Sequence, residues 1–196
     1  MANPFVEEEA PPCEIDPRAL VEAELSAYVV DFLAPIRRSR DYRIRLASAR
    51  QNIPVILDLV EADMMRHPFG HLDPLDPLLI GVVISTESAW DSKALGKLGE
   101  LGFMQVHGPA RGGFSEQDLR RPENQLAAGI RFLRKAVDLC EGDLPGGLNL
   151  YQTGRACRPL IRAVKRRWKR YQKALKLFRK EKNHVKTKCD KNPQAD

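Results

Sequence analysis

The chain has 196 residues, of which 43% are hydrophobic and 30% are charged, and its formal net charge is +6. A hydrophobic fraction of this size excludes wholesale disorder, and the length fits one globular domain with short appendages. No apolar run approaches the roughly 18 residues that a membrane-spanning helix needs.

The charge is unevenly distributed along the chain. Residues 1–154 carry a net charge of −7, whereas residues 155–196 carry +13. A basic segment on a mildly acidic body favours a polyanionic neighbour, either nucleic acid, anionic lipid or an anionic wall polymer. The alternative explanation is the ordinary charged face of a packed helix, and the two explanations are compatible.

The N-terminal part predicts a flexible arm followed by three helices. Residues 1–16 are acidic, contain three prolines and have few apolar anchors. A helix is expected over residues 17–35, because proline suits a first helical turn and apolar residues follow at helical spacing. Two shorter helices are expected over residues 42–51 and 54–65. The Pro-, Gly- and Asp-rich residues 67–77 predict a loop.

The second half predicts a buried helix, a glycine-rich stretch and two further helices. Asp76 and Pro77 open an almost wholly apolar helix that runs to Glu87 or Trp90 and should lie at the centre of the fold. Residues 91–121 contain six glycines and predict loops with a short helix near residues 115–119. The remaining expectations are helices over residues 122–140 and 159–182, with a break at residues 145–147.

No β-strand pattern of comparable strength is present, so the predicted fold class is all-α, with N-terminal helices and a C-terminal basic helix. The expected organisation is a flexible acidic arm (1–16), a single domain (17–182) and a flexible tail (183–196). Within the domain, the motif-bearing core spans residues 76–154 and the basic amphipathic helix spans residues 159–182.

The cysteines and histidines predict no metal site. The four cysteines, at positions 13, 140, 157 and 189, form no C-x-x-C pair and no zinc-like spacing. Free thiols in a reducing compartment are the favoured interpretation; a bridge between Cys140 and Cys157 is the alternative if the protein matures in an oxidising space. The histidines, His67, His71, His107 and His184, match no common ligand spacing, and no cofactor is expected.

Glu87 is the strongest candidate for a catalytic residue. It ends the apolar helix, where rigid packing can hold it beside a reacting oxygen. Apolar surroundings disfavour a carboxylate anion, so such an acid keeps its proton closer to neutral pH, as a general acid for glycosidic cleavage requires. Ser85 and Ser88 are placed to hydrogen-bond the carboxyl group or the nearby backbone. Taken alone, Glu87 would be an acid at the exposed end of a helix.

Two further segments accompany Glu87. The sequence G-E-L-G-F-M-Q over residues 99–105 contains a second acid, Glu100, and its glycines allow a close approach of the backbone to a neighbour. Tyr151 and Gln152 lie in a short polar-aromatic element, which suits sugar stacking and hydrogen bonding. The whole set, in this order, is much harder to obtain by accident than any one member.

These segments resemble the soluble lytic transglycosylase (SLT) domain, a lysozyme-like family related to goose-type lysozyme. The chain reads E-S-A-W-D-S-K-A over residues 87–94, where the family has E-S-x-aromatic-[DN]-x-x-A. It reads G-E-L-G-F-M-Q-V over residues 99–106, where the family has G-x-x-G-L-M-Q-[VI]. Residues 121–133 are similar to N-P-x-x-N-[IL]-x-x-G-[IV]-x-[YF]-L and residues 150–154 to A-Y-N-x-G. Arg121, Gln125 and Gln152 replace asparagines of the family pattern.

The resemblance implies a peptidoglycan lytic transglycosylase in which Glu87 is the single acid/base. Glu87 would protonate the oxygen between N-acetylmuramic acid and N-acetylglucosamine. The resulting carboxylate would take the proton of the muramoyl C6 hydroxyl as a 1,6-anhydro ring closes. No carboxylate nucleophile is needed. The residues that would line the cleft and contact the substrate are Ser88, Glu100, Met104, Gln105, Tyr151 and Gln152.

Several alternatives stay open. Glu100 either positions a water, which gives a goose-type hydrolytic muramidase, or is a loop acid that accepts hydrogen bonds from backbone amides; the loop acid is favoured. A polyanion-binding protein on a lysozyme-like scaffold is a further alternative, and so is a non-catalytic glycan-binding module. Nucleic acid is the less favoured partner, because the basic helix lacks a recognisable DNA- or RNA-binding motif.

The expected partners are therefore peptidoglycan strands and, through the basic residues 155–182, an anionic envelope surface. The N-terminus, M-A-N-P-F-V-E-E-E-A-P-P, lacks the basic start and apolar stretch of a secretory signal, so synthesis in the cytoplasm is expected. Action at the cell wall or in the periplasm then requires a phage context or a dedicated export route.

Overall fold

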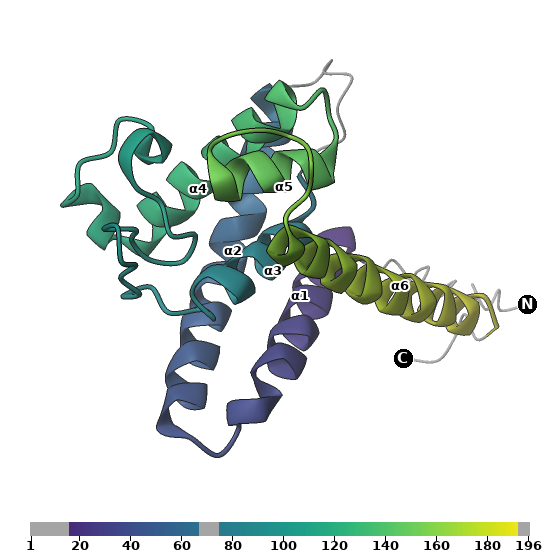
Figure 1. Ribbon diagram of the computed structural model, residues 1–196. Helices are drawn as coiled ribbons and strands as arrows, with labels where there is room; N and C mark the ends of the chain where they lie inside the picture. Colours follow the sequence, from purple (N-terminus) through teal and green to yellow (C-terminus); the bar gives the residue numbers. More distant parts are fainter. Residues whose placement is uncertain (1–15, 67–74, 192–196) are drawn as a thin grey trace, which may run out of the picture.

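The computed structural model describes residues 16–66 and 75–191, and side chains beyond Phe178 are not described. The described part is built from helices (Figure 1), with no strand beyond isolated bridges that join Leu101 to Leu95 and to Val106. The predicted all-α fold class is confirmed. The helices are α1 (Pro17–Leu33), α2 (Arg40–Arg66), α3 (Pro77–Glu87), α4 (Pro122–Leu139), α5 (Leu144–Thr153) and α6 (Arg162–Lys191), with short 3-10 turns η1 (Ala34–Ile36), η2 (Gly108–Arg111) and η3 (Asp118–Arg120).

Helix α3 is the centre of the fold, as predicted. Every residue from Leu78 to Ser85 is buried. Its start follows from the sequence, because Pro77 lies in the first turn and the carboxylate of Asp76 accepts the Leu78 N–H at 2.8 Å. Helices α1 and α6 pack against it. In Figure 1, α1 and α2 form an antiparallel pair, α4 and α5 lie together, and α6 projects away from them.

The prediction of two helices over residues 42–51 and 54–65 is wrong, because α2 is a single helix that contains Pro54. A proline in a helix interior removes one backbone hydrogen bond and costs about 3 kcal/mol. Buried apolar residues on both sides of the proline offset this cost, at roughly 1.5–3 kcal/mol for each fully buried side chain. They are Ile53, Ile56, Leu57 and Val60.

The predicted break at residues 145–147 is also wrong, since these residues form the first turn of α5. Pro145 is tolerated there because the first turn has no intrahelical acceptor for its missing N–H. A Cβ atom on Gly147 would lie 2.8 Å from the Cα atom of Val137, so the glycine permits close packing of α5 on α4. Helix α5 ends at Thr153, and the next residue, Gly154, has a φ of +64°, the left-handed conformation typical of the residue after a helix.

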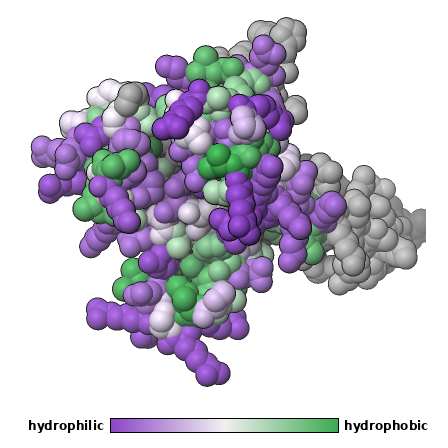
Figure 2. All heavy atoms as spheres, viewed as in Figure 1, coloured by the Kyte–Doolittle hydropathy of each residue, from purple (hydrophilic) through white to green (hydrophobic). Residues whose placement is uncertain are grey.

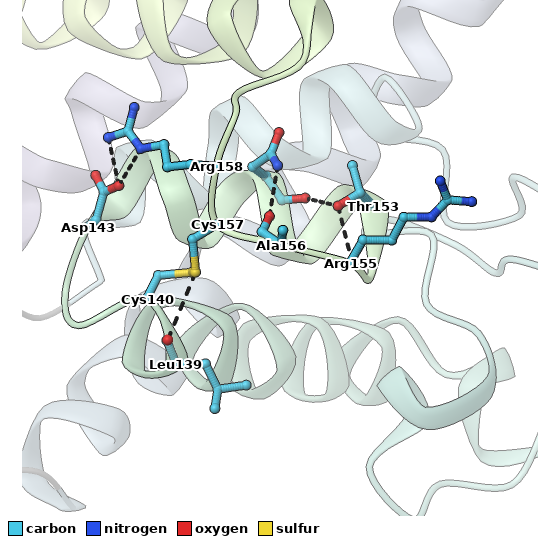
Figure 3. Close-up of a disulfide and its surroundings, with 9 residues drawn as sticks. Leu139, Cys140, Asp143, Thr153, Arg155, Ala156, Cys157 and Arg158 are labelled. Carbon is cyan, nitrogen blue, oxygen red and sulfur yellow. Dashed lines mark hydrogen bonds and ion pairs between the residues drawn. A yellow bond between two sulfur atoms is a disulfide. The ribbon is translucent and has the colours of Figure 1, made fainter.

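Cys140 and Cys157 form a disulfide, with their Cα atoms 5.7 Å apart (Figure 3). The favoured prediction of free thiols is therefore wrong for this pair, and the alternative is correct. The antiparallel packing of α4 and α5 brings the end of α4 beside the segment that follows α5. Arg158, in that segment, forms an ion pair at 2.7 Å with Asp143, which precedes α5. Closing this short loop removes freedom from the unfolded chain and stabilises the fold by about 3 kcal/mol.

The remaining predictions concern the ends of elements. Helix α6 continues to Lys191, beyond its predicted end at Lys182 and into the predicted tail. Most of the predicted arm and most of the loop at residues 67–77 lie outside the described residues, as do Cys13, His67 and His71. Over the described ranges, no helix combines the length and the apolar character needed to cross a membrane.

Candidate active site

A cavity of about 900 Å³ lies between the segment that follows α3 and the helices α4 and α5. This volume is within the range of ligand-binding pockets, roughly 300–1,000 Å³. Its wall combines charged, polar and apolar groups, which include Glu87, Lys97, Glu100, Gln105, His107, Phe132, Lys135, Leu150, Tyr151 and Gln152.

Glu87 is the last residue of α3, and its side chain is 18% exposed. Its Oε1 atom accepts a hydrogen bond from Nη2 of Arg167 at 2.7 Å, and the Arg167 side chain is only 4% exposed. Oε2 accepts no hydrogen bond from any described residue. The carboxyl group therefore contacts both the cavity and a buried cation, so its surroundings include a charge in addition to the apolar helix that the sequence indicates.

The burial of Arg167 can be recognised in the sequence if the packed face of α6 is taken to include position 167. Five positions of α6, spaced three or four residues apart, are buried: Val164, Arg167, Tyr171, Ala174 and Phe178. Position 167 thus falls on the packed face of an amphipathic helix. An arginine on such a face needs a buried partner. Its neighbours in a run of basic residues hide this signal.

Tyr151 lies close to both charges of this ion pair. Its hydroxyl group donates a hydrogen bond to the carbonyl oxygen of Met104, and its ring packs on Phe132 with the centroids 5.4 Å apart. Burial raises the pKa of Tyr151 far above its ordinary value; the negative charge of Glu87 raises it further, and Arg167 acts in the opposite direction. The phenol is therefore a neutral hydrogen-bond donor, not a base.

The turn after α3 orients Glu87 without binding its carboxyl group. The Ser88 hydroxyl donates to the Ile84 carbonyl at 3.3 Å, and the Ser85 hydroxyl accepts from the indole N–H of Trp90 at 2.9 Å. Both serines are thus committed to the helix end and to the buried tryptophan.

An arginine from another helix holds this turn. Ala89 and Trp90 adopt positive φ angles of 52° and 67°, a conformation that costs free energy in residues other than glycine. Nη1 of Arg45, on α2, donates to the carbonyl groups of Ser88 at 2.8 Å and Ala89 at 2.9 Å. Sequence reasoning missed Arg45, because nothing local marks a contact over more than forty residues.

Gln125 fixes the glycine-rich segment to α4. It is 2% exposed; its carbonyl oxygen accepts the Phe103 N–H at 3.0 Å, and its amide donates to the carbonyl groups of Ser92 and Leu119. A Cβ atom on Gly102 would lie 1.9 Å from the carbonyl oxygen of Gln125, so this glycine is required for the contact. Gln125, one of the departures from the family pattern, therefore makes three hydrogen bonds of its own.

Glu100 and Gln105 both combine a loop contact with a place in the cavity wall. The Glu100 carboxylate accepts the Leu98 N–H at 2.8 Å. Hydrogen bonds from the backbone N–H groups of Glu100 and Leu98 lower the pKa of Glu100, and the charge of His107 lowers it further. The Gln105 amide donates to the carbonyl groups of Gly102 at 2.9 Å and Ala94 at 3.3 Å.

Residues 73–177, more than half of the chain, match the family model of the transglycosylase SLT domain. The chain belongs to this family. No similar protein was found among the curated proteins or among the solved structures. The family confirms the predicted resemblance and gives lytic-transglycosylase-type activity on peptidoglycan. The matched range contains α3 and most of the described side chains of α6, so both Glu87 and Arg167 lie inside the SLT domain.

The structure brings most of the predicted site residues of this SLT domain together. Those that line the one cavity are Glu87, Glu100, Gln105, Tyr151 and Gln152. The side chains of Ser88 and Met104 are buried and are not part of its wall; Met104 contributes through its carbonyl group. Within the described ranges, no group of three or more His, Cys, Asp and Glu side chains is arranged to hold a metal ion.

Proposed function

We propose that this SLT domain cleaves the β-1,4 bond between N-acetylmuramic acid and N-acetylglucosamine, with Glu87 as the single acid/base and a 1,6-anhydro sugar as product. The observation that carries the proposal is the position of Glu87. Its carboxyl group ends a rigid buried helix and faces a cavity of about 900 Å³ in a chain of the SLT family. An acid held in this way can approach one oxygen of a bound glycan.

The proposed reaction uses one carboxyl group twice. In its acid form, Glu87 gives its proton to the glycosidic oxygen while the bond from that oxygen to the muramoyl C1 atom breaks. The carboxylate then accepts the proton of the C6 hydroxyl, whose oxygen bonds to C1. Glu87 ends the cycle protonated, so neither water nor a second carboxylate is consumed. Phe132 and Leu150 supply apolar wall for a sugar face, and Tyr151 is held by the Met104 carbonyl.

Hydrolysis is the second candidate, because Glu100 lines the same cavity as Glu87. A carboxylate there could hold a water against C1, and the product would then be a reducing end. The bond from the Leu98 N–H to Glu100 supports the loop-acid role instead, since it ties one oxygen of the carboxylate to the backbone. We therefore retain anhydro-sugar formation as the leading proposal.

The test is Glu87→Gln, which keeps the shape of the side chain and removes the acid. The rate of clearing of a cell-wall suspension is expected to fall by about 10²–10⁴-fold, the usual contribution of general acid–base catalysis. Glu116→Gln, at an exposed acid outside the cavity wall, is the matched control and should clear at the wild-type rate. Clearing by Glu87→Gln at the wild-type rate would refute the assignment. Product mass analysis of the wild type separates anhydro-muropeptides from reducing ends.

We also propose that the domain works on the cell-wall side of the membrane, beside an anionic envelope surface. The disulfide supports an oxidising compartment. Helix α6 buries one face and exposes basic residues on the other, and hydrophilic residues predominate over its described part in Figure 2. The exposed basic residues include Lys165, Arg166, Lys169, Lys173 and Lys176.

Co-sedimentation with anionic phospholipid vesicles tests this placement. Binding is expected at about 50 mM NaCl and should be largely lost at about 500 mM, because exposed charges are screened. Equal binding at both concentrations would refute an electrostatic role, and stronger retention on DNA than on vesicles at physiological salt would favour the nucleic-acid alternative. Thiol labelling of Cys140 and Cys157 in freshly lysed cells would contradict the oxidising compartment.

A further inference from the structure

Helix α6 holds α3 at both of its ends. At the C-terminal end, Arg167 pairs with Glu87 at 2.7 Å. At the N-terminal end, the Tyr171 hydroxyl donates to the carboxylate of Asp76, the N-cap residue, at 2.7 Å. The helix that carries the proposed acid is thus fixed to α6 by two side chains that lie one turn apart. Such cross-links restrict both rotation and sliding of α3.

The Arg167 side chain is buried outside the cavity wall where it pairs with Glu87. Arg167 is not part of the cavity wall, whereas Glu87 is. The Nε and Nη1 atoms of Arg167 are buried and have no hydrogen-bond partner among the described residues. Glu87 is also the only described acid that forms an ion pair with Arg167. The guanidinium group is therefore committed to Glu87 and does not reach the space in which a glycan would bind.

From this geometry we propose that Arg167 is a positioning residue for the acid/base step. It holds Oε1 of Glu87 from the buried side, which leaves Oε2 as the oxygen that faces the cavity. It also stabilises the carboxylate that exists after the proton has reached the leaving oxygen and before the C6 hydroxyl returns one. A cation already in place for this charge needs no rearrangement during the reaction. The proposal rests on the proposed function of Glu87.

The decisive measurement compares Arg167→Gln and Arg167→Lys with the wild type, by kcat and KM on purified peptidoglycan and by melting temperature. Arg167→Gln is expected to lower kcat by about 10- to 100-fold with KM changed by less than about threefold, because orientation and charge are lost but no sugar contact is. Arg167→Lys should recover part of kcat, since it keeps the charge without the planar fork.

Arg134→Gln is the matched control. Arg134 is also buried and pairs with an acid, Asp63, at 2.7 Å, but neither residue belongs to the cavity wall. This variant should lower the melting temperature at least as much as Arg167→Gln does and leave kcat within about threefold of the wild type, measured well below the melting transition. A merely structural role for Arg167 would give both variants the same pattern, and that result would overturn the proposal.

Two further variants keep the outcomes distinct. If Arg167→Gln does not fold, Arg167→Met replaces it, because an apolar side chain of similar length avoids an unpaired polar group, and the same loss of kcat is expected. Glu87→Gln separates the two proposals. Full activity of Glu87→Gln would refute the function proposed for Glu87, whereas an inactive Glu87→Gln with a wild-type kcat in every Arg167 variant would refute the positioning role alone.

Discussion

Two arginine–carboxylate pairs of nearly equal geometry lie in different parts of this chain. Arg134 and Asp63 join α4 to α2 at 2.7 Å, with side chains 8% and 9% exposed. Arg167 and Glu87 join α6 to α3 at the same distance, with side chains 4% and 18% exposed. Both arginines are buried, but only the second acid lines the cavity of about 900 Å³. The same interaction can therefore complete a core in one place and leave a reactive oxygen open in another.

The difference lies in how much of each pair is removed from water. Both partners of the core pair lose most of their hydration, and each charge is compensated in part by the other. Glu87 keeps part of its contact with the cavity, and only its partner is fully buried. Loss of the acid should therefore cost more stability in the core than at the cavity, whereas the effect on activity should have the opposite order.

Asp63→Asn breaks the core pair and carries the largest expected effect on stability. It removes the negative charge that pairs with the buried Arg134, and the free energy of unfolding should fall by about 3–5 kcal/mol. Glu87→Gln should lose less, because the Glu87 side chain is 18% exposed and that of Asp63 is 9% exposed, so Glu87 loses less hydration in the folded state. Guanidinium denaturation of both variants measures the difference. A stability loss at Glu87 equal to that at Asp63 would break the comparison.

The activity of Asp63→Asn tests the other part of the comparison, the effect on catalysis. Below its melting transition, Asp63→Asn should retain the wild-type kcat, because neither Asp63 nor Arg134 lines the cavity. A large fall in kcat for this variant, at a temperature where the protein is folded, would show that the core pair also controls the site.

The locally encoded parts of the molecule could be predicted from the sequence. The boundaries of α3 follow from Asp76, Pro77 and a continuous apolar run, and α4 follows from Pro122 and its regular apolar spacing. Glu87 gained its assignment from the ordered motifs around it. These signals need only neighbouring residues or a family pattern, so no tertiary information was required.

The misjudged features depend on contacts between distant residues. A proline such as Pro54 normally ends a helix, but buried apolar residues on both sides stabilise α2 across this position. Gly147 predicts a break, yet it is a contact point with Val137 on α4. The pairing of Cys140 with Cys157 needs the packing of α4 on α5, and the role of Arg167 needs a partner eighty residues away. Local propensity cannot supply any of these.

Glu100 extends the comparison to a third carboxylate, one that backbone amides stabilise in place of an arginine. Those hydrogen bonds hold the pKa of Glu100 below its ordinary value of 4.5. A group whose folded pKa is lowered contributes stability that is present above its unfolded pKa and lost as the pH falls through the folded pKa. The contribution should be the smallest of those compared, because Glu100 is exposed to solvent screening.

An NMR titration of the Glu100 side chain measures this effect, and its midpoint should lie below 4.5. The protection factor of the Leu98 amide hydrogen should fall in the same pH range, because that N–H loses its acceptor when the carboxylate is protonated. A midpoint at or above the ordinary value would mean that the hydrogen bond from the loop does not stabilise the charged carboxylate.

The product analysis of Glu100→Gln separates the two roles proposed for Glu100, loop acid and water-positioning residue. A loop acid leaves the ratio of anhydro to reducing ends unchanged, whereas a residue that positions water lowers the share of reducing ends. Only the second result would place Glu100 beside Glu87 in the chemistry; the first would leave Glu87 as the single reacting carboxyl group, held in position by Arg167.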